Sequence, residues 1–351
     1  MRVLVTGGAG FIGSTLVRRA LSAGHDVLNV DKLTYASIPE SLSGAEVSGR
    51  YRFWKADICD AAEMDSAISE FQPDVVFNLA AETHVDRSID GPDAFIRTNI
   101  NGVHTLLEAC RRAIGMGVLP DTFRFVQVST DEVFGSIQVG EFDETSPYQP
   151  NSPYSASKAS ADMLVRAWNR TYGFPAILTN CSNNYGPWQF PEKFIPTVIL
   201  KAVRGETIPV YGDGQQVRDW LYVDDHAEAL LLVGQRGKIG ETYCIGGGCT
   251  LANLDLARLI GDLVDDRLGT ADRKRSRDLI RFVDDRPGHD RRYAINHGKI
   301  TRELGWTPQS SIENGIASTV DWYLGRQDWL SALASKGLAG QRLGLAKEER
   351  S

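Results

Sequence analysis

Two adjacent acidic residues, Asp131 and Glu132, lie within the stretch STDEVFG at residues 129–135. They directly follow the apolar run FRFVQVST, which is typical of a buried strand, so two charges and two hydroxyls come together at a strand end. Adjacent carboxylates in a closed site oppose each other's ionisation, so one can stay protonated while the other is ionised. The pair could therefore supply an acid and a base side by side. Solvated turn residues are the alternative.

A tyrosine and a lysine, Tyr154 and Lys158, form a YxxxK spacing in PYSASK, within a stretch that we expect to be helical. Residues at i and i+4 share one face of a helix, so the phenol and the ammonium can reach the same substrate hydroxyl. A free phenol is a weak base at neutral pH, because its reference pKa is about 10. A nearby lysine and a positive nicotinamide ring favour the phenolate. The pair indicates a base for alcohol oxidation, although an exposed helix surface is the alternative for such a pair taken alone.

A glycine-rich turn, VLVTGGAGFIG at residues 3–13, carries Gly7, Gly10 and Gly13 directly after an apolar strand and before a helix. Such glycines allow a tight turn and let the backbone approach a pyrophosphate, which then lies at the helix N-terminus. Asp31 ends the next strand, where a carboxylate can accept hydrogen bonds from the adenosine ribose and repel a 2′-phosphate. The pattern therefore predicts NAD rather than NADP. A purely structural glycine turn is the alternative.

Strand and helix patterns alternate along the first half of the chain. The expected strands are 2–7, 26–31, 51–57, 74–81, 123–130 and 176–182, and the expected helices lie near 11–23, 60–71, 93–115 and 152–172. This alternation predicts an α/β fold, a Rossmann-type doubly wound parallel sheet, with a smaller α/β C-terminal substrate lobe. We expect an NAD-binding domain at 1–185, interwoven with a nucleotide-sugar lobe at 186–330, and a frayed tail at 331–351. Asp57 with Ile58, and Leu79 with the small residues Ala80 and Ala81, lie at strand ends and are expected beside the cofactor. An ordinary strand-ending acid is the alternative for Asp57.

The composition is that of an ordinary globular chain of 351 residues, with 42% hydrophobic and 24% charged residues. A net charge of −7 argues against a nucleic-acid partner. We interpret the densest basic run, DRKRSR at 272–277, as a solvated loop or helix end, with a role near an anionic substrate as the alternative. Five cysteines without a CxxC pair favour reduced thiols and a cytoplasmic location. No metal site, secretion signal or membrane span is predicted.

Several separate stretches together resemble the extended short-chain dehydrogenase/reductase family of NAD-dependent nucleotide-sugar epimerases and dehydratases. They cover about residues 1–325 and are TGGAGFIGS, DKLTYA, AAETHVDRSI, STDEVFG, NSPYSASKA, CSNNYGPWQFPEKFIP, VRDWLYVDDHA and DRPGHDRRYAIN. The resemblance implies a homodimer formed through two long helices, here 93–115 and 152–172, packed as a four-helix bundle.

The resemblance further implies a 4,6-dehydratase, which is a lyase that uses NAD catalytically. Thr130 would hydrogen-bond the 4-hydroxyl of the hexose, and Tyr154 would remove its proton. The resulting ketone acidifies the proton at C5, which Glu132 would take, while Asp131 would protonate the departing C6 hydroxyl. Epimerases and decarboxylases of the family need only the Thr, Tyr and Lys set, so the paired acids favour dehydration.

The predicted site residues fall into two further sets. The cofactor-binding set is Gly7, Gly10, Phe11, Ile12, Gly13, Asp31, Lys32, Leu33, Thr34, Asp57, Ile58, Leu79, Ala80, Ala81, Thr98, Tyr154, Lys158 and Asn184. The substrate-binding set implied by the resemblance is Thr83, Arg87, Thr130, Asn183, Lys193, Phe194, Pro209, Tyr211, Arg218, Asn253, Arg286 and His289. Within it, the two arginines Arg218 and Arg286 are natural partners for a diphosphate.

Three points stay open in the sequence. The implied substrate is dTDP-glucose, but UDP-glucose is an alternative because the tail lacks an aromatic residue that some members place near the base. An NAD-dependent UDP-sugar 4-epimerase or decarboxylase, and a non-catalytic NAD-binding sensor, are alternative functions. Phe134 stands where the family usually has Tyr, and the effect of the missing hydroxyl is undetermined.

Overall fold

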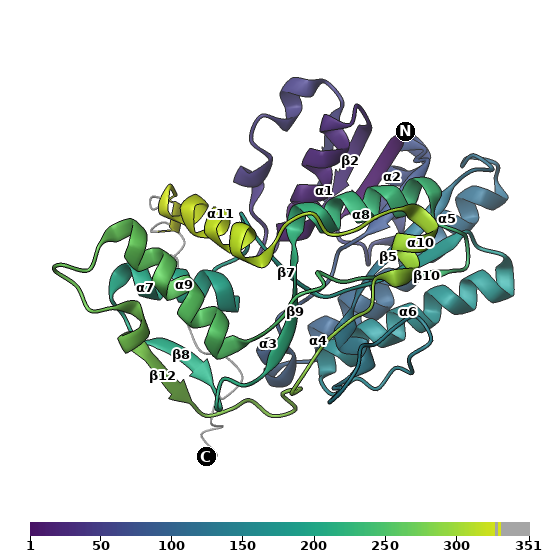
Figure 1. Cartoon of the computed structure of the whole chain (residues 1–351). Helices are drawn as coiled ribbons and strands as arrows, with labels where there is room; N and C mark the ends of the chain where they lie inside the picture. Colours follow the sequence, from purple (N-terminus) through teal and green to yellow (C-terminus); the bar gives the residue numbers. More distant parts are fainter. Residues whose placement is uncertain (327–328, 331–351) are drawn as a thin grey trace, which may run out of the picture.

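The structure of the chain, a computed structural model, describes residues 1–326 and 329–330 (Figure 1). Its centre is a sheet of seven parallel strands. In sheet order these are β10 (Thr242–Ile245), β6 (Ala176–Cys181), β5 (Arg124–Thr130), β4 (Val75–Asn78), β1 (Arg2–Thr6), β2 (Asp26–Val30) and β3 (Tyr51–Trp54). The chain runs outward from β1 first in one direction and then in the other, which is the order of a doubly wound sheet. The predicted Rossmann-type fold is confirmed.

Helices cover both faces of this sheet because successive strand residues point to opposite sides. In β1, Val3 and Val5 pack into one core and Leu4 packs into the other. The helices on the first face are α1 (Phe11–Ser22), α8 (Val223–Arg236) and α10 (Gly298–Leu304). Those on the second face are α2 (Ala61–Phe71), α5 (Val103–Gly115) and α6 (Pro153–Tyr172). Strands buried on both faces explain the nearly continuous apolar runs of the sequence.

A smaller lobe lies at one end of the sheet, on the left in Figure 1, and has a core of its own. Its strands are β7 (Asn183–Tyr185), β9 (Val217–Tyr222) and β11 (Thr250–Ala252) in one sheet, and β8 (Ile208–Tyr211) and β12 (Ile280–Val283) in another. Its helices are α7 (Phe194–Arg204), α9 (Asn253–Leu268) and α11 (Ile312–Leu324). The lobe borders the carboxyl ends of the central strands, so it can close a site formed there.

The chain passes between the two parts more than once. Residues 223–245, which the predicted boundary at 185 assigns to the lobe, form α8 and β10 and belong to the sheet unit. Helix α8 lies beside α1 in Figure 1, and β10 covers the edge of β6. The sequence did not reveal this return, because β10 is a four-residue strand among many glycines. The remaining division into two domains stays a prediction.

The predicted helix over 93–115 is one helical stretch with an irregular middle. It consists of α4 (Asp93–Phe95), the π-helical segment η3 (Ile96–Gly102) and α5. The wider π turn shifts the register of the side chains, and such turns are frequent at functional sites. Just before this stretch lies the short helix α3 (Val85–Asp90). The remaining short elements are the 3-10 turns η1 (Pro39–Leu42), η2 (Ala45–Ser48), η4 (Asp131–Phe134) and η5 (Ser276–Leu279).

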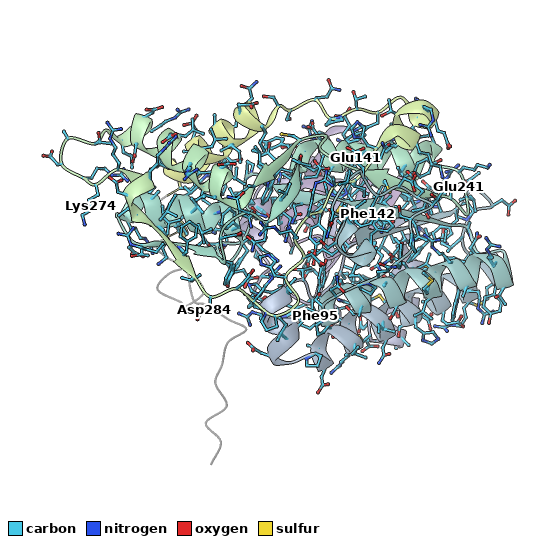
Figure 2. All side chains as sticks on the ribbon, turned by 60° about the horizontal axis from the view of Figure 1, so that its bottom comes forward. Phe95, Glu141, Phe142, Glu241, Lys274 and Asp284 are labelled. Atoms are coloured by element: carbon cyan, nitrogen blue, oxygen red, sulfur yellow. The ribbon has the colours of Figure 1, made fainter. Side chains whose placement is uncertain are left out.

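The basic run at 272–277 lies on an exposed loop after α9, as the favoured interpretation predicted. Figure 2 shows Lys274 at the opposite end of the molecule from Glu241. Two other residues of the basic run, Arg273 and Arg277, form ion pairs with Asp265 and Asp262 of α9, respectively. The run is therefore part of the solvated surface. The predicted frayed tail, 331–351, lies outside the described residues.

Candidate active site

A cavity opens at the carboxyl ends of the central strands, where doubly wound sheets bind their ligands. Its walls come from the turns after β1, β2, β3, β4 and β5, from the helical stretch that contains Thr98, from α6, and from the segment after β6. The five predicted catalytic residues, Thr130, Asp131, Glu132, Tyr154 and Lys158, all line it. The predicted cofactor residues that also line it are Gly7, Gly10, Phe11, Ile12, Gly13, Asp31, Lys32, Thr34, Asp57, Ile58, Leu79, Ala80, Ala81, Thr98 and Asn184. Leu33 is partly exposed and does not line the cavity.

The glycine turn between β1 and α1 is packed too closely for any side chain. A Cβ on Gly13 would lie 2.2 Å from the carbonyl oxygen of Gly7, and one on Gly7 would lie 2.8 Å from the backbone of Ala80. Helix α1 has no side-chain cap at Gly10 and no acidic residue in its first turn. Its first amide groups are therefore available to an anion, as binding of a pyrophosphate requires. These residues fit the expected NAD.

Asp31 is held rigidly at the end of β2. One of its carboxylate oxygens accepts from the amide of Ala9 at 3.0 Å, and the other accepts from the amide of Leu33 at 2.8 Å. The hydroxyl of Ser37 also donates to it, at 3.2 Å. A carboxylate oxygen can accept more than one hydrogen bond, so Asp31 retains capacity for ribose hydroxyls. This fixed negative charge in the cavity wall fits NAD better than NADP.

The two acids are placed by the end of β5. Thr130 is the N-cap of the turn η4, and its hydroxyl accepts from the amide of Glu132 at 3.2 Å. It also donates to Asp131 at 3.3 Å. Gly135 ends the turn with a positive φ of 79°, and a Cβ there would lie 2.3 Å from the carbonyl oxygen of Gln149. The tight turn thus presents both carboxylates to the cavity from one strand end.

The surroundings of the two acids favour different protonation states. Asp131 is 1% exposed, and burial together with the neighbouring Glu132 raises its pKa well above its usual range. Its Oδ2 atom is buried without a hydrogen-bond partner in the described part of the chain. Burial also raises the pKa of Glu132, but three cations oppose the rise: Arg286, Arg218 and Lys193. Asp131 is therefore suited to stay protonated, and Glu132 to ionise.

Tyr154 and Lys158 share one buried face of α6. The helix begins at Pro153 with a capping box formed by Ser152 and Ser155, which fixes where the first turn starts. Tyr154 is 8% exposed and Lys158 is 5% exposed. The ammonium of Lys158 donates to the carbonyl oxygen of Val128 at 2.7 Å. Both side chains thus point at the end of β5, which carries the acids.

The surroundings that the chain alone provides oppose the predicted phenolate form of Tyr154. Burial raises this pKa well above its usual value, and the carboxylates Glu132 and Asp131 add to the rise. The neighbouring hydroxyl of Thr130 lowers this pKa only in part. Burial also lowers the pKa of Lys158, which weakens its help. The predicted phenolate therefore depends on further positive charge, which the nicotinamide ring of NAD would supply.

The predicted substrate residues divide into two groups. Thr83, Asn183 and Lys193 line the cavity beside Thr130. The others do not line it and lie on α3, on elements of the lobe or on the segment after β12: Arg87, Phe194, Pro209, Tyr211, Arg218, Asn253, Arg286 and His289. Two residues of this outer group, Tyr211 and Arg286, are connected through Asp86 on α3. The carboxylate of Asp86 accepts a hydrogen bond from Tyr211 at 3.1 Å and one from Arg286 at 3.3 Å. Contact of this outer group with a nucleotide sugar stays a prediction.

The structure adds Glu192, a residue in the cavity wall that sequence reasoning missed. Glu192 accepts from the phenol of Tyr35 at 3.2 Å and lies 3.7 Å from Arg87. The guanidinium of Arg87 lies over the ring of Tyr35, 4.0 Å from its centroid. Glu192 therefore connects Tyr35, which follows β2 on the cofactor side of the cavity, with Arg87 on α3. Its position directly before Lys193 was the available signal.

Phe134, the departure from the family pattern, does not face the cavity. Its ring stacks on Phe142 with centroids 5.2 Å apart and meets Tyr148 edge-on at the same distance. It is 2% exposed and belongs to a separate apolar cluster behind η4. The missing hydroxyl therefore leaves the cavity wall unchanged. Among the residues that the structure describes, no group of three or more potential metal ligands gathers at any place.

Comparison with known proteins gives a consistent result. Residues 4–319 match a family model described as GDP-mannose 4,6 dehydratase. The dTDP-glucose 4,6-dehydratase of Salmonella typhimurium is 54% identical, over 95% of this chain and 96% of that protein. The dTDP-glucose 4,6-dehydratase of Xanthomonas campestris is 52% identical, over 97% of this chain and 98% of that protein.

Solved structures agree in fold. DesIV, the dTDP-glucose 4,6-dehydratase of Streptomyces venezuelae crystallised with NAD, has a TM-score of 0.85 and 44% identity over 94% of this chain and 98% of its own. The UDP-glucose 4-epimerase of Thermus thermophilus, also crystallised with NAD, has a TM-score of 0.82 at 29% identity, over 93% of this chain and 100% of its own. The greater likeness to the dehydratases agrees with the paired acids of η4. The chain belongs to the NAD-dependent epimerase/dehydratase family of extended short-chain dehydrogenases and reductases and, within that family, to the dTDP-glucose 4,6-dehydratases.

Proposed function

We propose that the chain is a hydro-lyase that converts dTDP-glucose to dTDP-4-keto-6-deoxyglucose. The observation that carries this proposal is the pair Asp131 and Glu132, which line the same cavity as Tyr154 and differ in electrostatic surroundings. Relatives that are 54% and 52% identical over nearly the whole chain bear the name of this activity. An epimerase has no use for a second acid beside its base.

NAD is the cofactor, and the glycine turn with Asp31 would hold its adenosine and pyrophosphate. Lys158 would hold the nicotinamide ribose, and Asn184 lies on the wall where the nicotinamide is expected. When bound, NAD would supply the hydride chemistry of the reaction, which is oxidation at C4 of the hexose and reduction at C6. Every other step is acid or base chemistry carried out by side chains of this protein.

The first step needs a base at the 4-hydroxyl. Thr130 and Tyr154 line the cavity together, so both can contact one hydroxyl. Tyr154 takes the proton of that hydroxyl as C4 is oxidised to the ketone. Lys158, one turn along α6, stabilises the phenolate by its charge.

The second step removes water across C5 and C6. The C4 ketone acidifies the C5 proton, and ionised Glu132 takes it. The C6 hydroxyl is a poor leaving group, so protonated Asp131 donates a proton to it as water departs. Its unpartnered Oδ2 atom is free to meet this hydroxyl. A proton is restored at C5 when C6 is reduced, which leaves the 4-keto-6-deoxy product.

The nucleotide part of the substrate would extend from the cavity toward the lobe. Lys193 lines the wall, and Arg218 and Arg286 lie close enough to act on Glu132, so these three cations form a positive region beside the reacting sugar. A diphosphate would bind there through charge-assisted hydrogen bonds. Preference for the dTDP base is supported by the names of the relatives.

Incubation of the purified chain with dTDP-glucose and with UDP-glucose tests the proposal. We expect dTDP-glucose to be turned over to a 4-keto product, which is followed by its absorbance in alkali. UDP-glucose should react more slowly. A galactose isomer without alkali absorbance would instead identify an epimerase. No turnover of either nucleotide hexose would favour a cofactor-binding sensor.

We also infer a homodimer through α5 and α6. The two helices pack against each other, and apolar side chains remain exposed along them, including Met163 and Ile114. Light scattering should give the mass of a dimer for the parent chain and of a monomer for Met163→Glu. Val47→Glu, at a more exposed position in η2, is the matched control and should remain dimeric. A monomeric parent chain would contradict the inference.

A cytoplasmic location is proposed from the five cysteines, all of which carry free thiols in the structure. Fractionation of cells that produce the chain tests it. Among the described residues, no helix is long and apolar enough to span a membrane.

A further inference from the structure

A buried carboxylate, Asp162, lies one turn beyond Lys158 on α6. It is 0% exposed and does not line the cavity, so it cannot touch substrate or cofactor. Its Oδ2 atom accepts from the hydroxyl of Ser129 at 2.6 Å and from the phenol of Tyr148 at 3.1 Å. Its Oδ1 atom is buried without a hydrogen-bond partner in the described part of the chain. A full negative charge at such a position needs a compensating charge.

The positive charges that face Asp162 are those of Lys158 and Arg166, both on α6. Lys158 is itself buried, and the residues whose charges act on it are Asp162 on its own helix and the thiol of Cys181 on β6. Each of the pair is thus the principal opposite charge of the other. Removing one member of a buried pair leaves the other uncompensated, which favours its neutral form.

The same carboxylate also fixes the end of β5, which carries the reactive residues. Lys158 binds the carbonyl oxygen of Val128 at 2.7 Å, and Asp162 binds the side chain of Ser129. Asn180 on β6 completes the set by donating to the carbonyl oxygen of Thr130 at 3.1 Å. Three successive residues of the strand are therefore held by buried side chains of α6 and β6.

We propose that Asp162 is a positioning residue whose buried carboxylate keeps Lys158 charged and aimed at the cofactor and the substrate hydroxyl. The inference rests on the proposed function for the role of Lys158. It adds a residue that acts through another and never contacts the reacting atoms. The mechanism needs it because Lys158 would hold the nicotinamide ribose and stabilise the phenolate only while its ammonium is charged.

A double-mutant cycle on NAD affinity tests the proposal without any substrate. Asp162→Asn keeps the size of the side chain and an acceptor oxygen but removes the charge. We expect it to weaken NAD binding by about 10-fold, measured by calorimetric titration. In the Lys158→Met background the same substitution should change the affinity little, because no ammonium remains for the carboxylate to keep charged. Equal weakening in both backgrounds would show that Asp162 acts through the fold alone, and would overturn the proposal.

The pH dependence of NAD affinity gives a second readout. Asp162 raises the pKa of Lys158 against the effect of burial, so its removal lowers that pKa further. The loss of affinity at alkaline pH should therefore begin at lower pH in Asp162→Asn than in the parent chain. An unshifted profile would contradict the proposal. Failure to turn over dTDP-glucose would leave both binding tests intact, so the two proposals fail separately.

Asp225→Asn is the matched control for loss of a buried carboxylate. Asp225 accepts from the amides of Gln309 and Ser310 at 3.2 and 2.9 Å, on the opposite face of the sheet. We expect a lower melting temperature without any shift in the pH profile of NAD binding. If Asp162→Asn fails to fold alone but folds together with Lys158→Met, the uncompensated ammonium is the cause and the proposal stands. Misfolding in both backgrounds would overturn it.

Discussion

Replacing Tyr154 by Phe is expected to reduce kcat for dTDP-glucose about 100- to 10,000-fold, the usual range for loss of a positioned acid or base. The substitution removes one hydroxyl from a ring that is 8% exposed and already packed against Phe95. The variant is therefore blocked at the oxidation of C4, before the ketone forms. No reduced cofactor should therefore accumulate, and the C5 proton should not exchange with deuterated solvent, because only the ketone makes that proton acidic.

The control for this variant is its stability. Phe fits the space of Tyr154, so the melting temperature and NAD binding should stay close to those of the parent chain. Absorbance of the reduced nicotinamide and mass spectrometry of the recovered sugar nucleotide check the two kinetic expectations. A variant that still exchanged C5 at the parent rate would place the base for C4 oxidation on another group.

The sheet and its glycine turn could be predicted from the sequence because local patterns determine them. Strands buried on both faces appear in the sequence as apolar runs, and Gly7 and Gly13 of the glycine turn occupy positions where a Cβ would meet backbone. Strand β10 was not predicted, since its place beside β6 depends on a pairing distant in sequence. The π-helical turn of η3 carries no local signal that separates it from an ordinary helix.

The residues that line the cavity were largely predictable, because they follow strand ends or lie one turn apart on a helix. The pKa shifts of these residues could not be predicted. The pKa of Tyr154 rises through burial and two carboxylates, which depends on distances that no spacing reveals. Asp162 was missed although it lies four residues after Lys158, since a buried acid behind a site looks like any helix acid in a sequence.

The two acids of η4 should give separate phenotypes. Glu132→Gln removes the base at C5 but leaves Thr130 and Tyr154 in place. We expect C4 oxidation to proceed and stall, with reduced cofactor accumulating, no C5 exchange, and overall turnover lower by about 100- to 10,000-fold. Asp131→Asn removes the acid at C6 instead. The C5 proton should then still exchange with solvent, while loss of water falls by a similar factor.

The pH dependence follows from the surroundings of the pair. Glu132 must be ionised, so the rate of water loss rises as pH rises through its pKa, which burial raises against three cations. Asp131 must be protonated, so the rate falls again as pH passes its pKa, which burial and Glu132 raise well above the usual range. Asp131→Asn should lack this alkaline fall in the small rate that remains, because Asn does not titrate there. C5 exchange that is lost in Asp131→Asn but kept in Glu132→Gln would require the two roles to be exchanged.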